Sequence, residues 1–208
     1  SELKVNESPG ERDVQARSGS PLRVLLEALL IAVLVTTFVV TAISISGDSM
    51  SPTLIDGERV LIPRYETWLH RLGIGSFAPG DVVYFPSPDQ EEGAVCPLFC
   101  TYLIKRIVAV EGDVVELRRG QLFVNGTPVA EEYLPPGWRA AISLPPTPVP
   151  QDHVFVLGDN RAPYGSFDSR AFGPIPQRSI EGRARLVVWP LLRQNESGGR
   201  ELNARLIH

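Results

Sequence analysis

A serine in a short turn-like segment is the first side chain whose type and setting could support chemistry. Ser49 lies in the sequence Gly-Asp-Ser-Met-Ser-Pro-Thr over residues 47–53. Gly47 permits a close approach of the backbone, and Pro52 restricts the chain just after the serine. A hydroxyl held in such a turn could act as a nucleophile, although a polar linker would have the same composition. Ser49 therefore needs a base before a reaction can be assigned to it.

Lysine usage supplies a candidate base. The only lysines of the chain are Lys4 and Lys105, and all other Lys/Arg cations are arginines. An ammonium loses its proton when it is desolvated, whereas a guanidinium stays charged. Lys105 stands in the apolar run 102–110, where strand alternation would place it on one face with three apolar side chains, those of Leu103, Ile107 and Ala109. Such burial would keep the amine neutral, as a general base requires, unless the lysine reaches solvent at a strand edge.

Other reaction classes find less support in the sequence. His70, His153 and His208 lack the spacing of a metal motif, and no phosphate-binding glycine loop is present. Cys96 and Cys100, four residues apart, fit a small disulfide or free thiols better than a metal site. The net charge of −4 and the isoelectric point near 5.5 disfavour nucleic-acid binding. We expect no metal, no cofactor and no nucleic-acid partner.

An apolar run near the N-terminus bears on where this chemistry takes place. Residues 28–47 contain no charged side chain, and such a length of helix matches a bilayer core of about 30 Å. We therefore expect a transmembrane helix over 22–46 and a lipid bilayer as partner. The alternative is a cleaved signal peptide, but the apolar stretch exceeds the ~7–15 residues of such a segment.

The distribution of arginines predicts the orientation of this expected anchor. Arg12, Arg17 and Arg23 precede or begin the run, and the first cation after it is Arg59. This bias places the N-terminus in the cytosol. The sequence thus predicts a single-pass protein of the cell membrane whose main domain lies on the extracytoplasmic side.

The remaining chain predicts one mostly β, barrel-like domain over 47–192. Glycine and proline are frequent, with 18 and 19 residues, and short runs of branched and aromatic side chains alternate with turns. The proline-rich segment 128–150 is expected to be an irregular excursion over the core. Segments 1–21 and 193–208 are polar and are expected to be a disordered cytosolic tail and a flexible C-terminal tail.

Three short motifs in this order resemble the conserved boxes of the bacterial type I signal peptidases. They are Ser49-Met50-x-Pro52-Thr53, the strand 102–106 leading to Gly112-Asp113, and Gly158-Asp159-Asn160-Arg161 with Asp168-Ser169-Arg170. The resemblance covers roughly residues 22–190. It implies a membrane-anchored serine endopeptidase that removes signal peptides from exported preproteins after small residues, of the Ala-x-Ala type.

The resemblance also implies roles for individual residues. Ser49 is similar to the family's nucleophile and Lys105 to its general base. Ser166 resembles the hydroxyl that orients the lysine, although the loop 162–166 is about two residues longer than usual. Four charged residues resemble a bracing network, namely Asp159, Arg161, Asp168 and Arg170.

The same comparison suggests an oxyanion hole and a substrate pocket. Gly47 stands where some members carry a Ser or Thr hydroxyl, so the backbone N–H of Ser49 is expected to bind the oxyanion. Met50, Leu54 and Ile104 resemble pocket-lining positions. The segment 65–77, with its aromatic side chains, could contact lipid headgroups or pack on the domain.

Three alternatives stay open at this point. A Ser/His hydrolase could use His153 near Asp159. A self-cleaving repressor also uses a serine and a lysine, but no DNA-binding helix pair is evident. A catalytically silent, membrane-anchored β domain would retain the motifs without activity.

Overall fold

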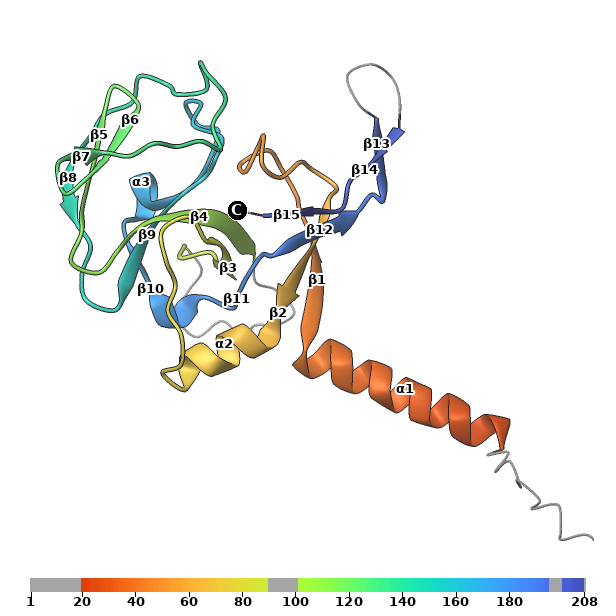
Figure 1. Cartoon of the computed structure of the whole chain (residues 1–208). Coiled ribbons are helices and arrows are strands. Elements are labelled where there is room, and N and C mark those ends of the chain that lie inside the picture. The colour runs from red at the N-terminus through yellow and green to blue at the C-terminus, as the bar shows by residue number, and fades with distance from the viewer. Residues whose placement is uncertain (1–19, 90–100, 195–199, 208) are drawn as a thin grey trace, which may run out of the picture.

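The computed structural model describes residues 20–89, 101–194 and 200–207. Strands predominate in this part of the chain, and the helices are few and short apart from the first (Figure 1). The expected mostly β fold is confirmed. Residues 1–19 of the predicted tail, together with Cys96 and Cys100, lie outside the described residues.

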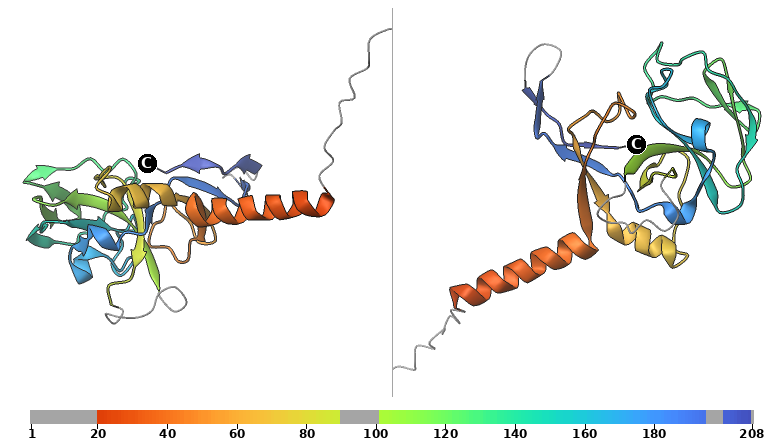
Figure 2. Two further views of the ribbon diagram at one scale, coloured as in Figure 1. Left: turned by 90° about the horizontal axis from the view of Figure 1, so that it is seen from below. Right: turned by 180° about the vertical axis from the view of Figure 1, so that it is seen from behind.

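The first helix is shorter than the sequence predicts. Helix α1, Pro21–Phe38, extends away from the β domain (Figure 2). Its apolar side chains from Leu22 to Leu34 are exposed. The following strand β1, Val40–Ser44, pairs with β2, Arg59–Pro63. The prediction of one helix over 22–46 is therefore wrong, because the β-branched residues after Phe38 form a strand that pairs with β2. Among the described residues, no helix combines the length and apolar character that a bilayer crossing requires.

The remaining strands form antiparallel sheets. The first has the order β1-β2-β12-β15, with β12 at Leu186–Trp189 and β15 at Arg205–Leu206. The second has the order β10-β9-β4-β3-β11, comprising Ile175–Pro176, His153–Leu157, Tyr102–Val110, Val82–Pro86 and Gly182–Arg183. The third has the order β7-β6-β5-β8, comprising Thr127–Pro128, Gln121–Val124, Val114–Arg118 and Leu144–Pro148. Strands β13, Leu192–Gln194, and β14, Arg200–Leu202, pair with each other.

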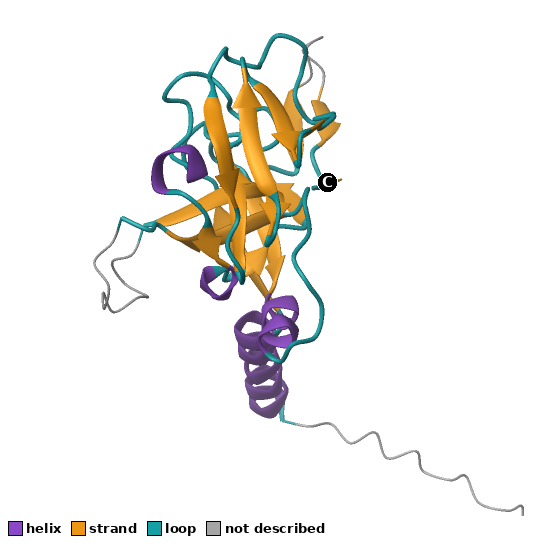
Figure 3. Ribbon diagram, turned by 90° about the vertical axis from the view of Figure 1, so that its left-hand side faces the viewer, coloured by secondary structure: helices purple, strands orange, loops and turns teal. Residues whose placement is uncertain are grey.

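Short helices lie at the periphery of this β structure (Figure 3). Helix α2, Arg64–Arg71, follows β2 directly, and α3, Ser169–Phe172, follows the loop after β9. A single 3₁₀ turn spans Gln177–Ser179. Most of the chain between the strands is irregular loop. Polar side chains near the sheets therefore come from loops as well as from strands.

Strand β4 is central in its sheet and buried on both faces. Its register with β9 shifts between Ile107 and Ala109, so the two residues belong to different core clusters. The predicted shared face of Leu103, Ile107 and Ala109 therefore ends at this irregularity, because a bulge reverses the alternation of side chains. Lys105 precedes the shift and is 2% exposed.

Two segments are more ordered than the sequence predicts. Strand β8 within the proline-rich excursion 128–150 pairs with β5 as the outer strand of its sheet. Prolines are tolerated there because an outer strand needs ladder bonds on one side only. In the predicted tail 193–208, the described residues include β14 and β15, and β15 pairs with β12. Residues 200–207 therefore include paired strands, and the prediction of a flexible tail is wrong for them.

Candidate active site

The side chains of Ser49 and Lys105 meet although 56 residues separate them in sequence. Lys105 Nζ lies 2.8 Å from Ser49 Oγ and also 2.8 Å from the carbonyl oxygen of Ile104, to which it donates. Strand β4 supplies the lysine, and the loop between β1 and β2 supplies the serine. An amine at this distance can accept the hydroxyl proton when it is neutral.

Burial makes the neutral form of this amine accessible. Desolvation lowers the pKa of Lys105 from its ordinary value to about 8. The carboxylates of Asp168 and Asp159 oppose this change by raising the pKa, and the guanidinium of Arg170 assists it. About half of the lysine side chains are therefore uncharged near pH 8.

The serine loop is closed by hydrogen bonds at its base. The backbone N–H of Ile45 donates to the Glu58 carbonyl over 2.7 Å, and the N–H of Gly57 donates to the Ile45 carbonyl over 3.0 Å. Within the loop, Gly47 has φ +82° and donates its N–H to Asp56 Oδ1 over 2.8 Å. A left-handed conformation of this kind favours glycine, which accounts for the residue at 47.

Asn160 ties the serine loop to the loop that follows β9. Its backbone N–H donates to the Ser49 carbonyl over 3.0 Å, and its side-chain Nδ2 donates to the Asp48 carbonyl over 3.2 Å. Its Oδ1 accepts the N–H of Ala162. Asn160 thus fixes the backbone at the nucleophile candidate from outside the loop, a contact that no spacing in the sequence indicates.

The four charged residues predicted to brace the site are all engaged in ion pairs. Arg106 forms two hydrogen bonds with Asp159, at 2.9 and 2.8 Å, and both side chains are buried. Arg170 forms the same double contact with Asp168, at 2.8 Å each. Asp168 also accepts the N–H of Gly158 over 2.9 Å. The Arg106 pair therefore ties strand β4 to the loop after β9, and Asp168 holds the start of that loop at Gly158.

Arg161 makes a further buried pair that sequence reasoning missed. Its Nε donates to the Gly158 carbonyl over 2.9 Å, and its Nη2 pairs with Glu131, which is 2% exposed. The hydroxyl of Tyr133 donates to the same Glu131 carboxylate over 2.7 Å, and the Tyr133 ring lies 4.0 Å from the guanidinium carbon of Arg106. The acidic residue reaches this cluster from the segment after β7, so only the fold could identify it.

Ser166 lies close to the dyad but makes no hydrogen bond in the described part of the chain. Its Oγ is buried, and it packs against Gly158, where an added Cβ would lie 2.2 Å from Ser166 Oγ and 2.5 Å from the Ser49 carbonyl oxygen. The structure therefore brings Ser166 beside the backbone of Ser49. Its predicted role in orienting Lys105 stays a prediction.

A cavity of about 210 Å³ opens beside the two side chains. Its lining combines the end of β1 with β3 and β4 and consists of Ile43, Ser44, Ile45, Ser46, Ser49, Tyr84, Tyr102, Leu103, Ile104 and Lys105. Ile104 thus lies where a pocket residue was expected. Met50 and Leu54 do not line it, because both are fully buried in a core cluster with Val60 and Val187.

Two tyrosines of this cavity were not predicted as site residues. The rings of Tyr84 and Tyr102 stack with centroids 4.6 Å apart, and burial raises the pKa of Tyr84 to about 12. Tyr84 pairs with Ile104 in the strand ladder. Since this pairing joins β3 to β4, the position of Tyr84 depends on a register that the sequence alone does not define.

The histidine alternative is not supported by the geometry. His153 Nδ1 lies 2.7 Å from the carbonyl of Gln151, and its ring lines a different cavity together with His70. The Asp159 carboxylate is engaged by Arg106. Within the described residues, no group of three or more His, Cys, Asp or Glu side chains could hold a metal ion.

Comparison with known proteins identifies the family of the chain. The sequence pattern of the family described as signal peptidase, peptidase S26, matches residues 20–189. The chain belongs to this family.

The relatives of the enzyme carry names of the same kind. A probable signal peptidase I-1 from Synechocystis is 34% identical over 84% of this chain and 84% of the relative. Signal peptidase I P from Bacillus subtilis subsp. natto is 33% identical over 82% and 88%. A probable thylakoidal processing peptidase 2 of Arabidopsis thaliana is 40% identical over 71% of this chain and 37% of its own length.

The enzyme is also similar to a protein of known structure. Signal peptidase I from Enterococcus faecalis covers 53% of this chain and 97% of its own, with 30% sequence identity and a TM-score of 0.42. The family match and the relatives show that the enzyme is a hydrolase of the signal peptidase I type. Signal peptide cleavage by a serine protease is the activity that the family supports.

Proposed function

We propose that the enzyme cleaves signal peptides with Ser49 as nucleophile and Lys105 as general base. The observation that carries this proposal is the separation of 2.8 Å between Lys105 Nζ and Ser49 Oγ, at a lysine that is 2% exposed. A desolvated amine beside a hydroxyl provides the base that a serine needs.

Acylation begins with transfer of the Ser49 proton to the lone pair of neutral Lys105. Ser49 Oγ then attacks the scissile carbonyl. The oxyanion that forms accepts a hydrogen bond from the backbone N–H of Ser49, in the loop that Gly47 begins. The resulting ammonium is stabilised by the Ile104 carbonyl, to which it donates over 2.8 Å. Lys105 returns the proton to the leaving amine, and the C–N bond breaks to leave an acyl-enzyme.

Deacylation uses the same base. Neutral Lys105 takes a proton from a water molecule that attacks the ester carbonyl, and Ser49 leaves with the proton returned by the lysine. Asp159 and Asp168 are each held in a double contact by an arginine, so their carboxylates are oriented away from this step by fixed partners. The lysine is thus the proton carrier in both halves of the reaction.

The cavity beside Ser49 and Lys105 is the proposed binding site for the residues before the cleaved bond. Its volume of about 210 Å³ has room for the alanine side chains of an Ala-x-Ala segment, and Ile43, Ile45 and Ile104 give its lining an apolar part. Strand β1 pairs only with β2 in the described part of the sheet, so its other edge could bind an extended peptide by backbone hydrogen bonds. The proposed partner is therefore a preprotein bearing a signal peptide.

The decisive experiment incubates detergent-solubilised enzyme with a preprotein whose signal peptide ends in Ala-x-Ala. Ser49→Ala and Lys105→Ala should each abolish cleavage, and His153→Ala should retain it. Cleavage by the Lys105→Ala protein would exclude the lysine mechanism. Absence of product with the unaltered enzyme would favour a catalytically silent domain.

We also propose that the enzyme rests on a lipid bilayer through α1 and α2. On α1 the apolar side chains from Leu22 to Leu34 are exposed, and the buried face of α2 is polar whereas its exposed face is apolar. Thr67 is buried and donates to the Glu181 carbonyl, while Tyr65, Trp68 and Leu69 are 50%, 44% and 40% exposed. Aromatic side chains favour the headgroup region, which supports this orientation.

Fluorescence quenching tests the lipid contact. The three tryptophans are Trp68, Trp138 and Trp189, so variants retaining one each can be made by changing the others to phenylalanine. Brominated lipid should quench Trp68 more strongly than Trp138, which lies far along the chain in the segment between β7 and β8. Equal quenching would exclude this surface. Protease accessibility in spheroplasts tests the proposed extracytoplasmic position of the β domain.

A further inference from the structure

The C-terminal strand contacts the base of the serine loop. Arg205 in β15 donates to both carboxylate oxygens of Glu58, over 2.9 and 2.8 Å, and to the backbone carbonyl of Thr53 over 2.9 Å. Glu58 is the residue whose carbonyl closes the loop with Ile45. The Arg205 guanidinium therefore holds both the C-terminal end of the loop that carries Ser49, at Glu58, and its middle, at Thr53.

The glutamate in this contact is buried and fully used. Glu58 is 3% exposed, its Oε2 accepts the N–H of Ile55 over 3.1 Å, and its Oε1 accepts Nδ2 of Asn203 over 3.2 Å. Burial alone would raise the pKa of Glu58, but the hydrogen bonds from Arg205, Ile55 and Asn203 and the charge of Arg205 hold it below its ordinary value. The carboxylate is therefore charged at the pH of the reaction and depends on Arg205 for its compensation.

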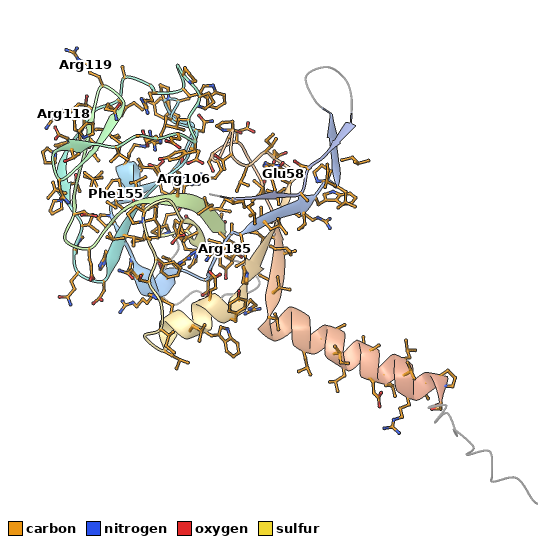
Figure 4. The ribbon with its side chains drawn as sticks, viewed as in Figure 1. Glu58, Arg106, Arg118, Arg119, Phe155 and Arg185 are labelled. Atoms are coloured by element: carbon orange, nitrogen blue, oxygen red, sulfur yellow. The ribbon has the colours of Figure 1, made fainter. Side chains whose placement is uncertain are left out.

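Thr53 also accepts a hydrogen bond from a second arginine. Arg106 donates to Thr53 Oγ1 over 3.4 Å, to the Gly80 carbonyl over 2.8 Å, and to Asp159. Arg106 follows Lys105 directly in β4 (Figure 4). Thr53 is thus held both by Arg205 and by Arg106. Because Arg106 is the neighbour of Lys105 in β4, this contact couples the serine loop to the strand that carries the proposed general base.

The same C-terminal segment also supports the loop by packing. Ile207 packs against the core cluster that contains Met50 and Leu54, the two apolar residues that anchor the loop on either side of its turn. The N–H of Ile207 donates to the Arg185 carbonyl over 3.0 Å, which continues the pairing of β15 with β12. Residues 200–207 therefore reach the loop through both polar and apolar contacts.

We propose that Arg205 is a positioning residue for catalysis, which keeps Ser49 at hydrogen-bond distance from Lys105 by fixing Glu58 and Thr53. This proposal rests on the Ser49 and Lys105 mechanism proposed above. The family match ends at residue 189, so it assigns nothing to this strand. A displacement of about 1 Å between reacting groups costs on the order of 100-fold in rate, so a serine loop that shifts when Arg205 is removed would react more slowly.

The test compares Arg205→Ala and Arg205→Lys with Arg118→Ala. Arg118 serves as the matched control because it pairs with Glu116 on the surface of β5, far from the site (Figure 4). Cleavage is measured per active site, with the number of active sites taken from the concentration of folded protein. Circular dichroism melting reports folding separately.

We expect Arg205→Ala to lower kcat per active site about 10- to 100-fold while KM changes less than threefold. The acid limb of its kcat/KM profile should move above pH 8, because a loosened loop admits water to Lys105. Arg205→Lys should recover part of the loss, since an ammonium can reach Glu58 but not all three acceptors at once. Arg118→Ala should match the unaltered enzyme.

The opposite results would overturn the proposal. An Arg205→Ala protein with a lower melting temperature but an unchanged kcat and pH profile would assign Arg205 to folding alone. If that variant does not fold, Arg205→Lys, which cannot reach all three acceptors at once, should still lower kcat, and an unchanged kcat in the folded Arg205→Lys protein would overturn the proposal. Cleavage by Ser49→Ala would instead exclude the proposed function itself, whatever the arginine variants do.

Discussion

Gly158 and Ser166 are in such close contact that no larger residue fits at position 158. An added Cβ would lie 2.2 Å from Ser166 Oγ and 2.5 Å from Ser166 Cβ, and it would also lie 2.5 Å from the Ser49 carbonyl oxygen. Gly158 is held on both sides, since its N–H donates to Asp168 and its carbonyl accepts from Arg161. The glycine therefore sets how near the loop of Ser166 comes to the loop of Ser49.

Substitution of this glycine should disturb both loops. We expect Gly158→Ala to reduce kcat/KM at least 100-fold and to destabilise the fold by about 1–3 kcal/mol, as overpacking does. The second substitution Ser166→Gly should recover part of the stability, because it removes two of the three clashing atoms. Melting curves and initial rates measure the two effects. Normal activity in Gly158→Ala would mean that the loops can separate without cost.

The pH dependence of cleavage follows from the lowered pKa of Lys105. Only the neutral amine can accept the serine proton, so kcat/KM should fall about tenfold per pH unit below the lysine pKa of about 8 and level off above it. The measurement is a pH profile from 6 to 10 with a peptide substrate. Lys105→Arg should be inactive throughout, because a guanidinium stays protonated. A profile that is flat between pH 6 and 9 would contradict the assignment of Lys105 as base.

The buried lysine should also lower the stability of the fold. Its pKa is about 8 in the folded state and 10.5 as the ordinary value, so the folded state binds fewer protons between these pH values. Stability of the unaltered enzyme therefore rises with pH across this window. We expect Lys105→Met to be inert but more stable, by about 3 kcal/mol below pH 8, with the gain shrinking toward pH 10.5. Urea unfolding at pH 7 and pH 10 compares the two proteins.

Neighbouring glutamates offer a matched pair for the cluster around Arg161. Glu131 is buried and pairs with Arg161, whereas Glu132 is exposed. Glu131→Ala should destabilise the fold by about 3–5 kcal/mol, because it leaves a buried guanidinium without its partner. Glu132→Ala should change stability by less than about 0.5 kcal/mol. Chemical denaturation measures both, and equal effects would show that the buried pair contributes nothing specific.

Local features of the chain allowed some of these relationships to be predicted. The motif around Ser49, the isolated Lys105 in an apolar run and the frequent turns indicated a mostly β fold with a candidate nucleophile and base, because a strand pattern and a rare residue type are visible without the fold. The resemblance of the three motifs to a known family implied the hydrolase. Local patterns were misleading at the N-terminus. The apolar run 28–47 resembles one helix, but its second half pairs with β2, since hydrogen bonding to a distant strand outweighs local propensity.

The sequence by itself therefore determined which residues could do chemistry and that strands would carry them. The tertiary structure alone decided the distance between Ser49 and Lys105, the burial of Glu131 and Glu58, and the contact of Arg205 with the serine loop. The physical reason is that each of these depends on strand pairing and desolvation between segments 30 to 152 residues apart. Composition and spacing do not show which distant side chains meet. The packed fold brings their polar atoms to hydrogen-bond distance.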